Sequence, residues 1–370
     1  MVQQYPKIQN TLDILVADST KPDTLEKIIP MTRVIACTAG PFDLYATPVV
    51  QLCSLYGTHY VDITGETDWV RKMVDTYDDD AKASGAKIVH FCGHDCVPWD
   101  MAVYLLAEEL RKRNENLIQV ECFDEINGAY SGGTMATLAH SLQNRKRVKA
   151  RLPYDPLLKM KHGESVEQPS ESRTEAKLQA SFGYNASAYK GNGAWVGPFI
   201  MAMVMANCIR RSNAINKYSG ANTLRYYEAL SYSNVYHMIR TCIYSVIFGT
   251  CLYTPILDQI LYKYFLPAPG EGPSEKDMKD GYLRITAVGT GDQGTKVQTT
   301  LVLGYDPGYV GTAAMLMECA DLLESEETSS QLLSGDEGGV YTPASCFGQP
   351  LMKSLRSIGF EYQTEILLEQ

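Results

Sequence analysis

Short apolar runs alternate with longer amphipathic stretches over roughly the first third of the chain. The apolar runs predict strands at residues 12–16, 34–38, 59–63 and 87–91. Helices are predicted between them, at residues 23–29, 47–56, 67–84 and 101–112, and Gly57 and Gly85 are typical stop signals. Strands that alternate with helices at this spacing pair in parallel through right-handed crossovers. Residues 1–117 are therefore predicted to form an α/β domain around a parallel sheet.

The pattern changes after residue 118. Strands are predicted at residues 118–126, 283–287 and 297–303, and the last two face each other across the Gly-rich turn at 289–295. Residues 131–134 lead into a helix whose exposed amides Thr134 can cap. Residues 164–177 and 325–339 are polar and predicted as loops, and 351–359 as a helix. We expect an α+β domain with a mixed sheet over residues 118–340, and a C-terminal segment, 341–370, that packs back on the first domain.

Three predicted strands of the first domain end in residues that are unusual for a simple turn. The segments are Thr38, Ala39, Gly40 and Pro41, then Thr64, Gly65 and Glu66, then Cys92, Gly93, His94 and Asp95. In open parallel sheets ligands bind beyond the carboxyl ends of the strands. Glycine lets the backbone approach a ligand closely, and proline fixes the turn without offering a donor. One such segment is ordinarily a tight turn, but three at one edge favour a ligand-binding crevice.

Charge and length narrow the class of protein. The chain has 33 Lys and Arg against 43 Asp and Glu, a net charge of −10, which argues against nucleic-acid binding because phosphates need a basic surface. The basic run at residues 145–151 is typical of a solvated helix end. A chain of 370 residues exceeds one ordinary core, so two domains are expected.

Ten cysteines are scattered along the chain, and its start lacks the charged and apolar segments of a signal peptide. Free thiols on the cytoplasmic side are therefore expected. Cys92, His94, Asp95 and Cys96 lie close together in sequence. No second Cys/His pair follows at zinc spacing, so no metal site is expected.

One apolar stretch bears on membranes. Residues 241–257 form an uncharged run of 17 positions between Arg240 and Asp258, interrupted by Pro255. This length is the lower limit for crossing a bilayer. A buried helix is the ordinary interpretation, as it is for the uncharged residues 191–209. The alternative is a helix on a membrane or lipid-droplet surface, with the contact running through residues 241–265.

Eight short motifs follow one another along the chain. They are TAGPFDLY (38–45), YVDITGE (60–66), GHDCVPWD (93–100), SGGT (131–134), RRS (210–212), GPS (272–274), DPGY (306–309) and GGVYTP (338–343). In order and spacing the chain resembles the saccharopine dehydrogenase-like oxidoreductases, the family that includes the trans-acting enoyl reductases. The likeness runs from about residue 12 to residue 360. No single motif is specific, and the resemblance rests on their order.

The resemblance implies an NAD(P)-binding, Rossmann-type domain followed by a substrate domain built on a mixed sheet. It implies that the turn at residues 38–41 passes beneath the nicotinamide half of NADP or NAD, and that Asp18 lies near the adenine. The cofactor-binding residues that it implies are Asp18, Thr38, Ala39, Gly40, Pro41, Thr64 and Gly65.

The chain also departs from the family. The Gly-rich phosphate loop of its relatives has no counterpart before residue 12. That loop belongs to a βαβ unit of roughly 30 residues or more, whose helix N-terminus binds the pyrophosphate. We therefore expect a truncated Rossmann-type sheet, and an incomplete version of the gene product rather than loss of dinucleotide binding. His94 and Cys96 stand where the family usually has Phe and Ser.

Two functions follow. The first is NAD(P)H-dependent reduction of a lipid-like or enoyl substrate, which needs a proton donor. Candidate acids are Tyr45, Glu66, Asp95 and Asp100. Arg210 and Arg211 suit a substrate carboxylate, although such a pair on a helix is more often structural. The second function is that of a non-catalytic membrane- or lipid-droplet-associated protein that keeps the fold without dinucleotide. A homodimer stays open in both.

Overall fold

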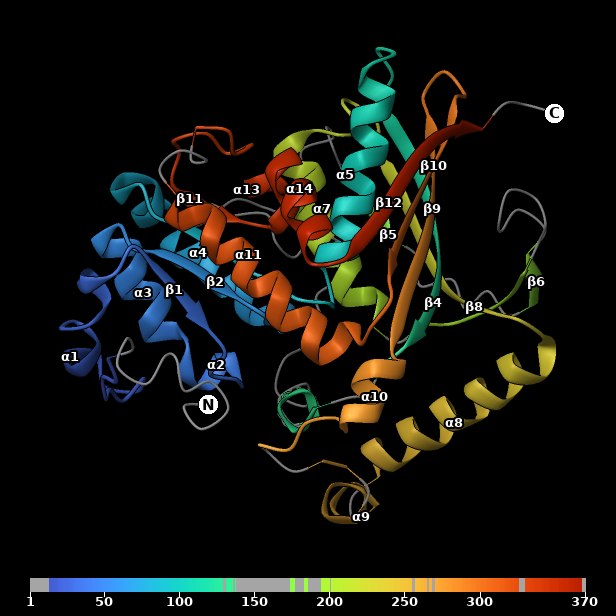
Figure 1. Cartoon of the computed structure of the whole chain (residues 1–370). Coiled ribbons are helices and arrows are strands. Elements are labelled where there is room, and N and C mark those ends of the chain that lie inside the picture. The colour runs from blue at the N-terminus through green and yellow to red at the C-terminus, as the bar shows by residue number, and fades with distance from the viewer. Residues whose placement is uncertain are drawn as a thin grey trace.

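Two sheets organise the protein (Figure 1). The computed structural model describes residues 13–128, 131–135, 137, 174–176, 183–185, 194–199, 201–254, 257–264, 266–267, 270–325 and 330–367. The smaller sheet combines three N-terminal strands with one strand from near the C-terminus, the larger sheet is built from strands after residue 116, and helices lie between the two sheets.

The smaller sheet is parallel, as predicted. Its order is β1-β2-β3-β11, from β1 (Val34–Cys37), β2 (His59–Asp62), β3 (Lys87–Val89) and β11 (Gly339–Tyr341). Helices α3 (Thr47–Tyr56) and α4 (Thr67–Ser84) have the predicted bounds. Gly57 and Gly85 follow them with φ of 77° and 80°, a left-handed conformation that glycine adopts without a Cβ clash.

The larger sheet is mixed, which confirms the predicted fold class of the second part. Its order is β12-β10-β9-β4-β8-β7-β6, and β5 also pairs with β8. The strands are β4 (Leu117–Asn127), β5 (Thr174–Ala176), β6 (Gly183–Asn185), β7 (Ala194–Gly197), β8 (Leu224–Tyr232), β9 (Tyr282–Gly291), β10 (Lys296–Leu303) and β12 (Phe360–Leu367). β9 and β10 pair in antiparallel fashion, as expected, whereas β4 and β8 are parallel. The loop predicted at residues 164–177 is wrong at residues 174–176, which form β5. Residues 164–173 lie outside the described part.

Helices cover the face of the larger sheet that is turned toward the smaller one (Figure 1). α5 (Val97–Arg111) packs on β4, β9 and β10, and α7 (Ala202–Asn216) packs on β5 and β8. α13 (Pro343–Phe347) and α14 (Gln349–Ser357) complete this layer, while α11 (Thr312–Glu324) crosses β1 and β2. The uncharged residues 191–209 therefore contribute a strand and a helix rather than one helix. The C-terminal segment begins at the last residue of β11 in the smaller sheet and contributes β12 to the larger one.

The strand predicted at residues 12–16 is wrong. Residues 13–17 form neither helix nor strand, and Ile14, Leu15 and Val16 are 84%, 55% and 92% exposed. Among the described residues no strand lies beside them, and a strand needs a neighbour to bond its amides and carbonyls. The next predicted helix is also shorter: α1 covers Pro22–Leu25, followed by the 3-10 turn Ile29–Met31.

Shorter elements shape the junction between the sheets. They are α2 (Phe42–Tyr45), α10 (Glu275–Asp280) and the π-helical turn Pro307–Gly311. The turn after residue 131 is helical, as predicted, but its cap is Ser131, because the Thr134 backbone N donates to Ser131 Oγ at 3.3 Å. A hydroxyl caps amides that follow it in sequence, so Thr134 lies one turn too late.

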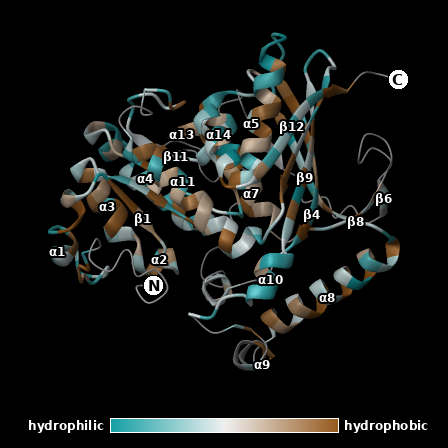
Figure 2. Cartoon of the chain, in the orientation of Figure 1, coloured by the Kyte–Doolittle hydropathy of each residue, from teal (hydrophilic) through white to brown (hydrophobic). Residues whose placement is uncertain are grey.

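Helix α8 (Val235–Tyr253) leaves the body of the protein, followed by α9 (Leu257–Tyr264) (Figure 1). By length and composition its segment Val235–Leu252 is able to span a bilayer, and only 6% of that segment is buried. Met238 is buried against the sheet, whereas Ile243 and Val246 are 52% and 68% exposed. Apolar residues lie along α8 with few neighbours (Figure 2). The interpretation of residues 241–257 as a buried helix is therefore wrong for most of the helix.

Candidate functional site

The carboxyl ends of β1, β2 and β3 meet at one edge of the parallel sheet. After β1, residues 38–40 are exposed and the Gly40–Pro41 peptide bond is cis. A Cβ on Gly40 would lie 3.3 Å from the Phe42 ring and 3.5 Å from Thr137 Oγ1, almost a hundred residues further along the chain. The exposed backbone turn therefore has little room for a side chain.

Glu66, after β2, fixes the position of this turn. Its Oε1 accepts a hydrogen bond from Phe42 N at 2.8 Å, and its Oε2 accepts one from Asp43 N at 2.9 Å. A carboxylate that bonds the first amides of α2 caps that short helix. The Glu66 amide donates to Thr64 Oγ1 at 3.0 Å. Glu66 therefore joins two of the three strand ends, and its part in catalysis stays a prediction.

A buried pair, Asp62 and His90, supports the same edge. Asp62 Oδ2 lies 2.7 Å from His90 Nδ1, and both side chains are fully buried. Asp62 Oδ1 accepts hydrogen bonds from the backbone N of Thr64 and of Phe91, each at 3.2 Å. One carboxylate thus holds the ends of β2 and β3 together. The sequence analysis missed this pair, although Asp62 lies within one of the eight motifs.

The third strand end packs against Thr312, the first residue of α11. A Cβ on Gly93 would lie 3.0 Å from Thr312 Cγ2, and the His94 backbone N donates to Thr312 Oγ1 at 3.0 Å. Burial lowers the pKa of His94 and raises the pKa of Asp95. Asp95 Oδ2 lies 3.8 Å from the place of a Cβ on Gly65. Asp95 therefore faces the second strand end, within the predicted crevice.

Asp100 and Tyr45 have different surroundings. Asp100 is fully buried, where its Oδ1 accepts from Ser212 Oγ at 2.5 Å and its Oδ2 from Ala344 N at 2.8 Å. Burial raises the pKa of Asp100 to about 6. These bonds join α5, α7 and α13, so Asp100 lies in the core between the helices. Tyr45 is 39% exposed on α2, next to the turn at residues 38–41.

Asp18 makes local contacts. Its side chain accepts from Thr20 N at 2.9 Å and Thr20 Oγ1 at 2.6 Å, and it pairs with Lys21 at 3.2 Å. The hydrogen bonds from Thr20 lower the pKa of Asp18 to about 2. The strand that was expected to precede Asp18 is not formed, so the cofactor contact of this residue stays a prediction without that support.

A second carboxyl pair lies inside the larger sheet and was missed by the sequence analysis. Asp124 on β4 and Glu228 on β8 belong to neighbouring parallel strands and are 0% and 6% exposed. Tyr226 Oη donates to Glu228 Oε2 at 2.6 Å. Neither oxygen of Asp124 has a hydrogen-bond partner, nor has Oε1 of Glu228. We call these two residues the acid pair.

Burial is the main cause of the raised pKa values of the acid pair. It raises the pKa of Glu228 to about 8. Burial and then the neighbouring Glu228 raise the pKa of Asp124 well above its ordinary value. A sequence signal exists in β4, because strand alternation places Asp124 on the same face as the buried Val120 and Cys122. An acid on an apolar face is the signal that could have found it.

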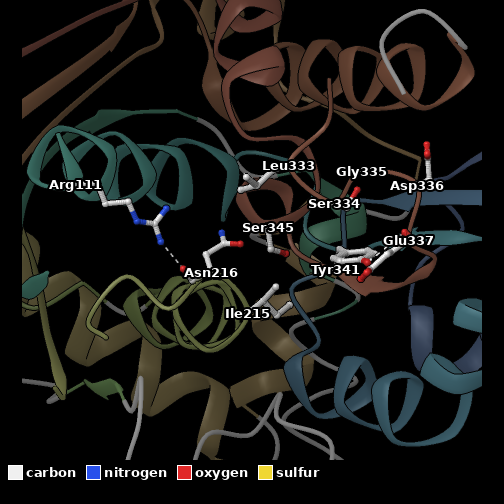
Figure 3. A pocket seen from close by; sticks show the side chains of 10 residues that line it. All are labelled: Arg111, Ile215, Asn216, Leu333, Ser334, Gly335, Asp336, Glu337, Tyr341 and Ser345. Atoms are coloured by element: carbon white, nitrogen blue, oxygen red, sulfur yellow. Dashed lines mark hydrogen bonds between the residues drawn. The ribbon is translucent and has the colours of Figure 1, made fainter. Parts of the chain in front are cut away.

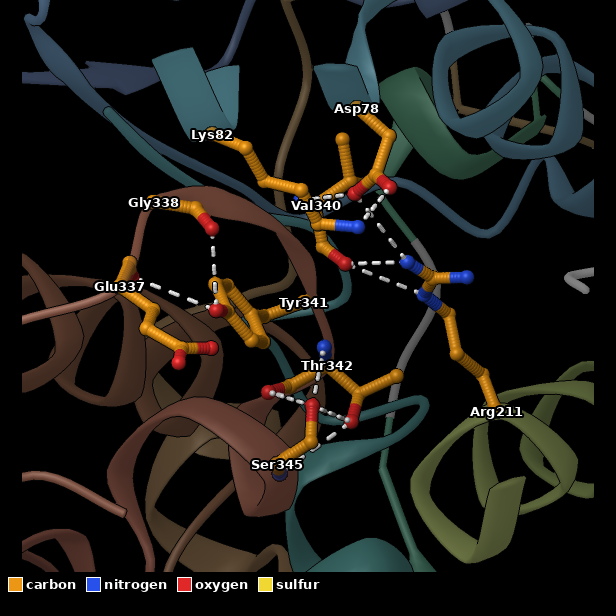
Figure 4. A network of polar contacts seen from close by, with 9 residues as sticks. All are labelled: Asp78, Lys82, Arg211, Glu337, Gly338, Val340, Tyr341, Thr342 and Ser345. Carbon is orange, nitrogen blue, oxygen red and sulfur yellow. Dashed lines mark hydrogen bonds and ion pairs between the residues drawn. The ribbon is translucent and has the colours of Figure 1, made fainter. Parts of the chain in front are cut away.

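Arg210 and Arg211 are buried rather than solvated, at 8% and 6% exposure. Arg211 Nε donates to the Val340 carbonyl at 3.2 Å, and Arg211 lies 3.9 Å from Asp78 Oδ1 (Figure 4). Asp78 Oδ1 also accepts from Val340 N at 2.9 Å. Arg211 thus fastens α7 to α4 and β11, which favours the structural interpretation of this pair over a carboxylate site.

The described residues also line a pocket of about 540 Å³. It lies between the last turns of α5 and α7 and the segment that leads to α13 (Figure 3). Arg111, Asn216, Asp336, Glu337 and Tyr341 are among its lining residues. Arg111 lies in the last turn of α5, whereas Tyr341 is the last residue of β11. Within the same described ranges, no group of three or more His, Cys, Asp or Glu could hold a metal ion.

Solved structures with a similar arrangement include a saccharopine dehydrogenase of Saccharomyces cerevisiae and an NAD complex of homospermidine synthase from Legionella pneumophila. The first has a TM-score of 0.48 and 10% identity over 95% of this chain and 88% of that chain. The second has a TM-score of 0.46 and 9% identity over 90% and 75%. These values are too low to carry an argument about chemistry. No family model matches the chain.

Comparison with known sequences gives relatives of higher identity than these solved structures. A Mycobacterium tuberculosis protein with the provisional name trans-acting enoyl reductase is 31% identical over 369 residues, covering 96% of this chain and 85% of the relative. A trans-acting enoyl reductase of Mycobacterium bovis is 28% identical over 364 residues, covering 94% and 83%. The agreement extends over nearly the whole chain. The chain therefore belongs to the saccharopine dehydrogenase-like family, in the group that contains the trans-acting enoyl reductases.

Proposed function

We propose that the protein is an oxidoreductase that uses NADPH or NADH to reduce the carbon–carbon double bond of a lipid-like enoyl substrate. The observation that carries this proposal is the exposed turn at residues 38–40, fixed by Glu66 and placed beside Thr137. A backbone edge at the carboxyl ends of parallel strands suits a dinucleotide. The names of the relatives add the reaction class.

The residues at this edge fit the nicotinamide half of the cofactor. Gly40 and Gly65 leave the backbone open, and their missing side chains would meet Phe42 and Asp95. Thr38 to Pro41, with Thr64 and Gly65, would hold the cofactor there. When bound, the nicotinamide supplies a hydride. The chain itself orients the turn through Glu66 and Asp62, and Thr137 and Val204 lie beside Gly40 and Gly65, respectively.

The proposal needs a proton donor for the second carbon of the double bond. Tyr45, Glu66, Asp95 and Asp100 stay candidates. Asp95 has the most suitable surroundings of the four, because it faces Gly65 and burial raises its pKa. Glu66 and Asp100 use both carboxyl oxygens in hydrogen bonds to other elements.

Cofactor binding by purified protein tests the proposal first. A ligand at a hundred times its Kd stabilises a protein by about 2.7 kcal/mol, so NADPH or NADH should raise the melting temperature. Gly40→Val should abolish this shift, since the new side chain would crowd Phe42 and Thr137. Gly249→Ala is the matched control, because nothing lies within 4 Å of its Cβ position on α8. The proposal fails if neither nucleotide shifts a protein that melts cooperatively.

A second proposal concerns attachment. We propose that α8 and α9 lie on a lipid surface, which is the alternative that the sequence analysis gave for residues 241–265. Ile243, Val246 and Ile247 are each more than half exposed, and Arg240 is the sole charged residue in Val235–Leu252. Exposed apolar helices of this kind bind membranes in proportion to their buried apolar area.

Flotation with phosphatidylcholine vesicles tests the attachment. The wild-type protein should rise with the vesicles, and the double variant Ile243→Ser, Val246→Ser should stay in the dense layer. Light scattering of the same samples without vesicles measures the mass. A dimer of wild type that the double variant loses would contradict the lipid proposal and assign the helix to a homodimer contact.

A further inference from the structure

A row of residues with unpartnered buried polar atoms runs from the third strand end into the larger sheet. The row consists of His94, Trp99, Asp124 and Glu228, and other described residues, such as Gln298 and Asp306, also have such atoms. The ring centroids of His94 and Trp99 lie 5.2 Å apart, and Trp99, in the first turn of α5, is fully buried. The Trp99 indole and the Glu228 carboxyl are near enough to Asp124 to shift its pKa, although neither forms a hydrogen bond with it within 3.5 Å.

These atoms are costly for a scaffold. A buried polar group without a partner destabilises a protein by about 1–3 kcal/mol, and most buried groups in native proteins have partners. Three other buried acids of the described part, Asp62, Glu66 and Asp100, each accept hydrogen bonds at both oxygens. Groups that violate this rule beside one another point to chemistry rather than stability.

The surroundings of the acid pair favour a retained proton. No lysine or arginine of the described ranges forms an ion pair with either carboxyl, and two neighbouring carboxylates in an apolar site cannot both ionise readily. The titratable groups that face the pair are Tyr226 and Cys122 from the sheet and Cys96 from the start of α5. All three are neutral in their ordinary state at neutral pH.

We infer that the acid pair Asp124–Glu228 supplies the proton for the enoyl reduction. This inference rests on the proposed function. As the double bond is reduced, one of its carbons gains a hydride from NAD(P)H, which is oxidised to NAD(P)⁺. The other carbon gains the carboxyl proton, leaving a carboxylate that solvent reprotonates. Trp99 covers the pair on the side of His94 and the strand ends.

The proton itself is measured without turnover. Difference infrared spectroscopy of wild type against Glu228→Gln, and of wild type against Asp124→Asn, should show a protonated carboxyl band at neutral pH that each variant removes or shifts. Glu121→Gln is the matched control, since Glu121 lies on the opposite face of β4. Absence of a protonated carboxyl assigned to the pair would overturn the inference, whether or not the protein binds a cofactor.

Reduction of decenoyl-CoA by NADPH measures the transfer. Wild-type activity should fall as the pH rises through about 8, where Glu228 loses its proton. Glu228→Gln should lower the rate by about 100-fold or more and lose this alkaline limb, while its NADPH affinity, measured by fluorescence, stays that of wild type. Asp95→Asn should keep the limb whatever its rate.

The outcomes separate this inference from the proposed function. Loss of the limb in Asp95→Asn, with the limb intact in Glu228→Gln, would assign the proton to Asp95 and overturn the role of the acid pair. A wild type that binds NADPH and reduces no enoyl thioester would also overturn it. A wild type that binds no nucleotide would instead overturn the proposed function, and the infrared band alone would then decide whether the pair holds a proton.

Discussion

Two sets of buried carboxyl groups in this protein have opposite surroundings. At the edge of the parallel sheet, Asp62 and Glu66 accept hydrogen bonds at both oxygens and join separate strand ends. Inside the mixed sheet, Asp124 accepts none and Glu228 accepts one, from Tyr226. Burial is similar in both places. The number of hydrogen bonds, rather than burial, therefore distinguishes an acid that builds the site from one that is available for chemistry.

The largest loss of stability is expected from removing Asp62, whose two carboxyl oxygens both accept hydrogen bonds. Asp62→Ala should lower the free energy of unfolding by about 3–5 kcal/mol, because it leaves His90 and two backbone amides buried without their acceptor. Urea denaturation followed by circular dichroism measures this. Asp80→Ala, an exposed acid of α4, is the control and should change stability by less than about 0.5 kcal/mol. Equal losses in the two variants would remove the distinction drawn above.

The acid pair should make the stability of the protein depend on pH. The pKa of Glu228 is about 8 in the folded chain against an ordinary 4.5, so between these values the folded chain binds more protons than the unfolded one. Stability then falls as the pH rises through this window. Relative to wild type, Glu228→Gln should gain up to about 4 kcal/mol from pH 5 to pH 8. Thermal denaturation over this range measures it, and a constant difference would contradict the assignment.

Loss of the cap at the exposed turn should have an intermediate effect. Glu66→Ala should destabilise the protein by about 2 kcal/mol, since two amides of α2 lose a charged acceptor. Glu66→Gln keeps one acceptor oxygen and should lose about half as much. Urea denaturation compares the two variants. Full stability in Glu66→Ala would show that the turn at residues 38–41 holds its shape without the carboxylate.

The sequence pattern predicted the parallel sheet well and the site in part. α3 and α4 have the predicted bounds because each ends at a glycine, a local signal that needs no knowledge of the fold. The strand at residues 12–16 failed because a strand depends on a neighbour that local sequence does not contain. For the same reason β8 was missed, although its five buried positions pair it with β4, β5 and β7.

The candidate acids show more clearly which parts of the site can be predicted from sequence. Glu66 and Asp95 were predicted from their places at strand ends, which the topology of a parallel sheet brings together. Asp124 and Glu228 are more than a hundred residues apart in sequence and meet because β4 and β8 pair. Long-range pairing of this kind has no local signature, and only the acid on an apolar face of each strand marked the site.

The smallest expected effect tests the one hydrogen bond that the acid pair receives. Tyr226→Phe removes the donor to Glu228 Oε2, which should cost about 1 kcal/mol of stability. That hydrogen bond lowers the pKa of Glu228, so its loss should raise the pKa further and carry the protonated carboxyl band to higher pH. Infrared titration of the variant measures the shift. Movement of the band to lower pH would mean that Tyr226 stabilises the neutral acid. The acid pair would then resemble Asp62 and Glu66, which are held by their hydrogen bonds, more closely than its unpartnered oxygens indicate.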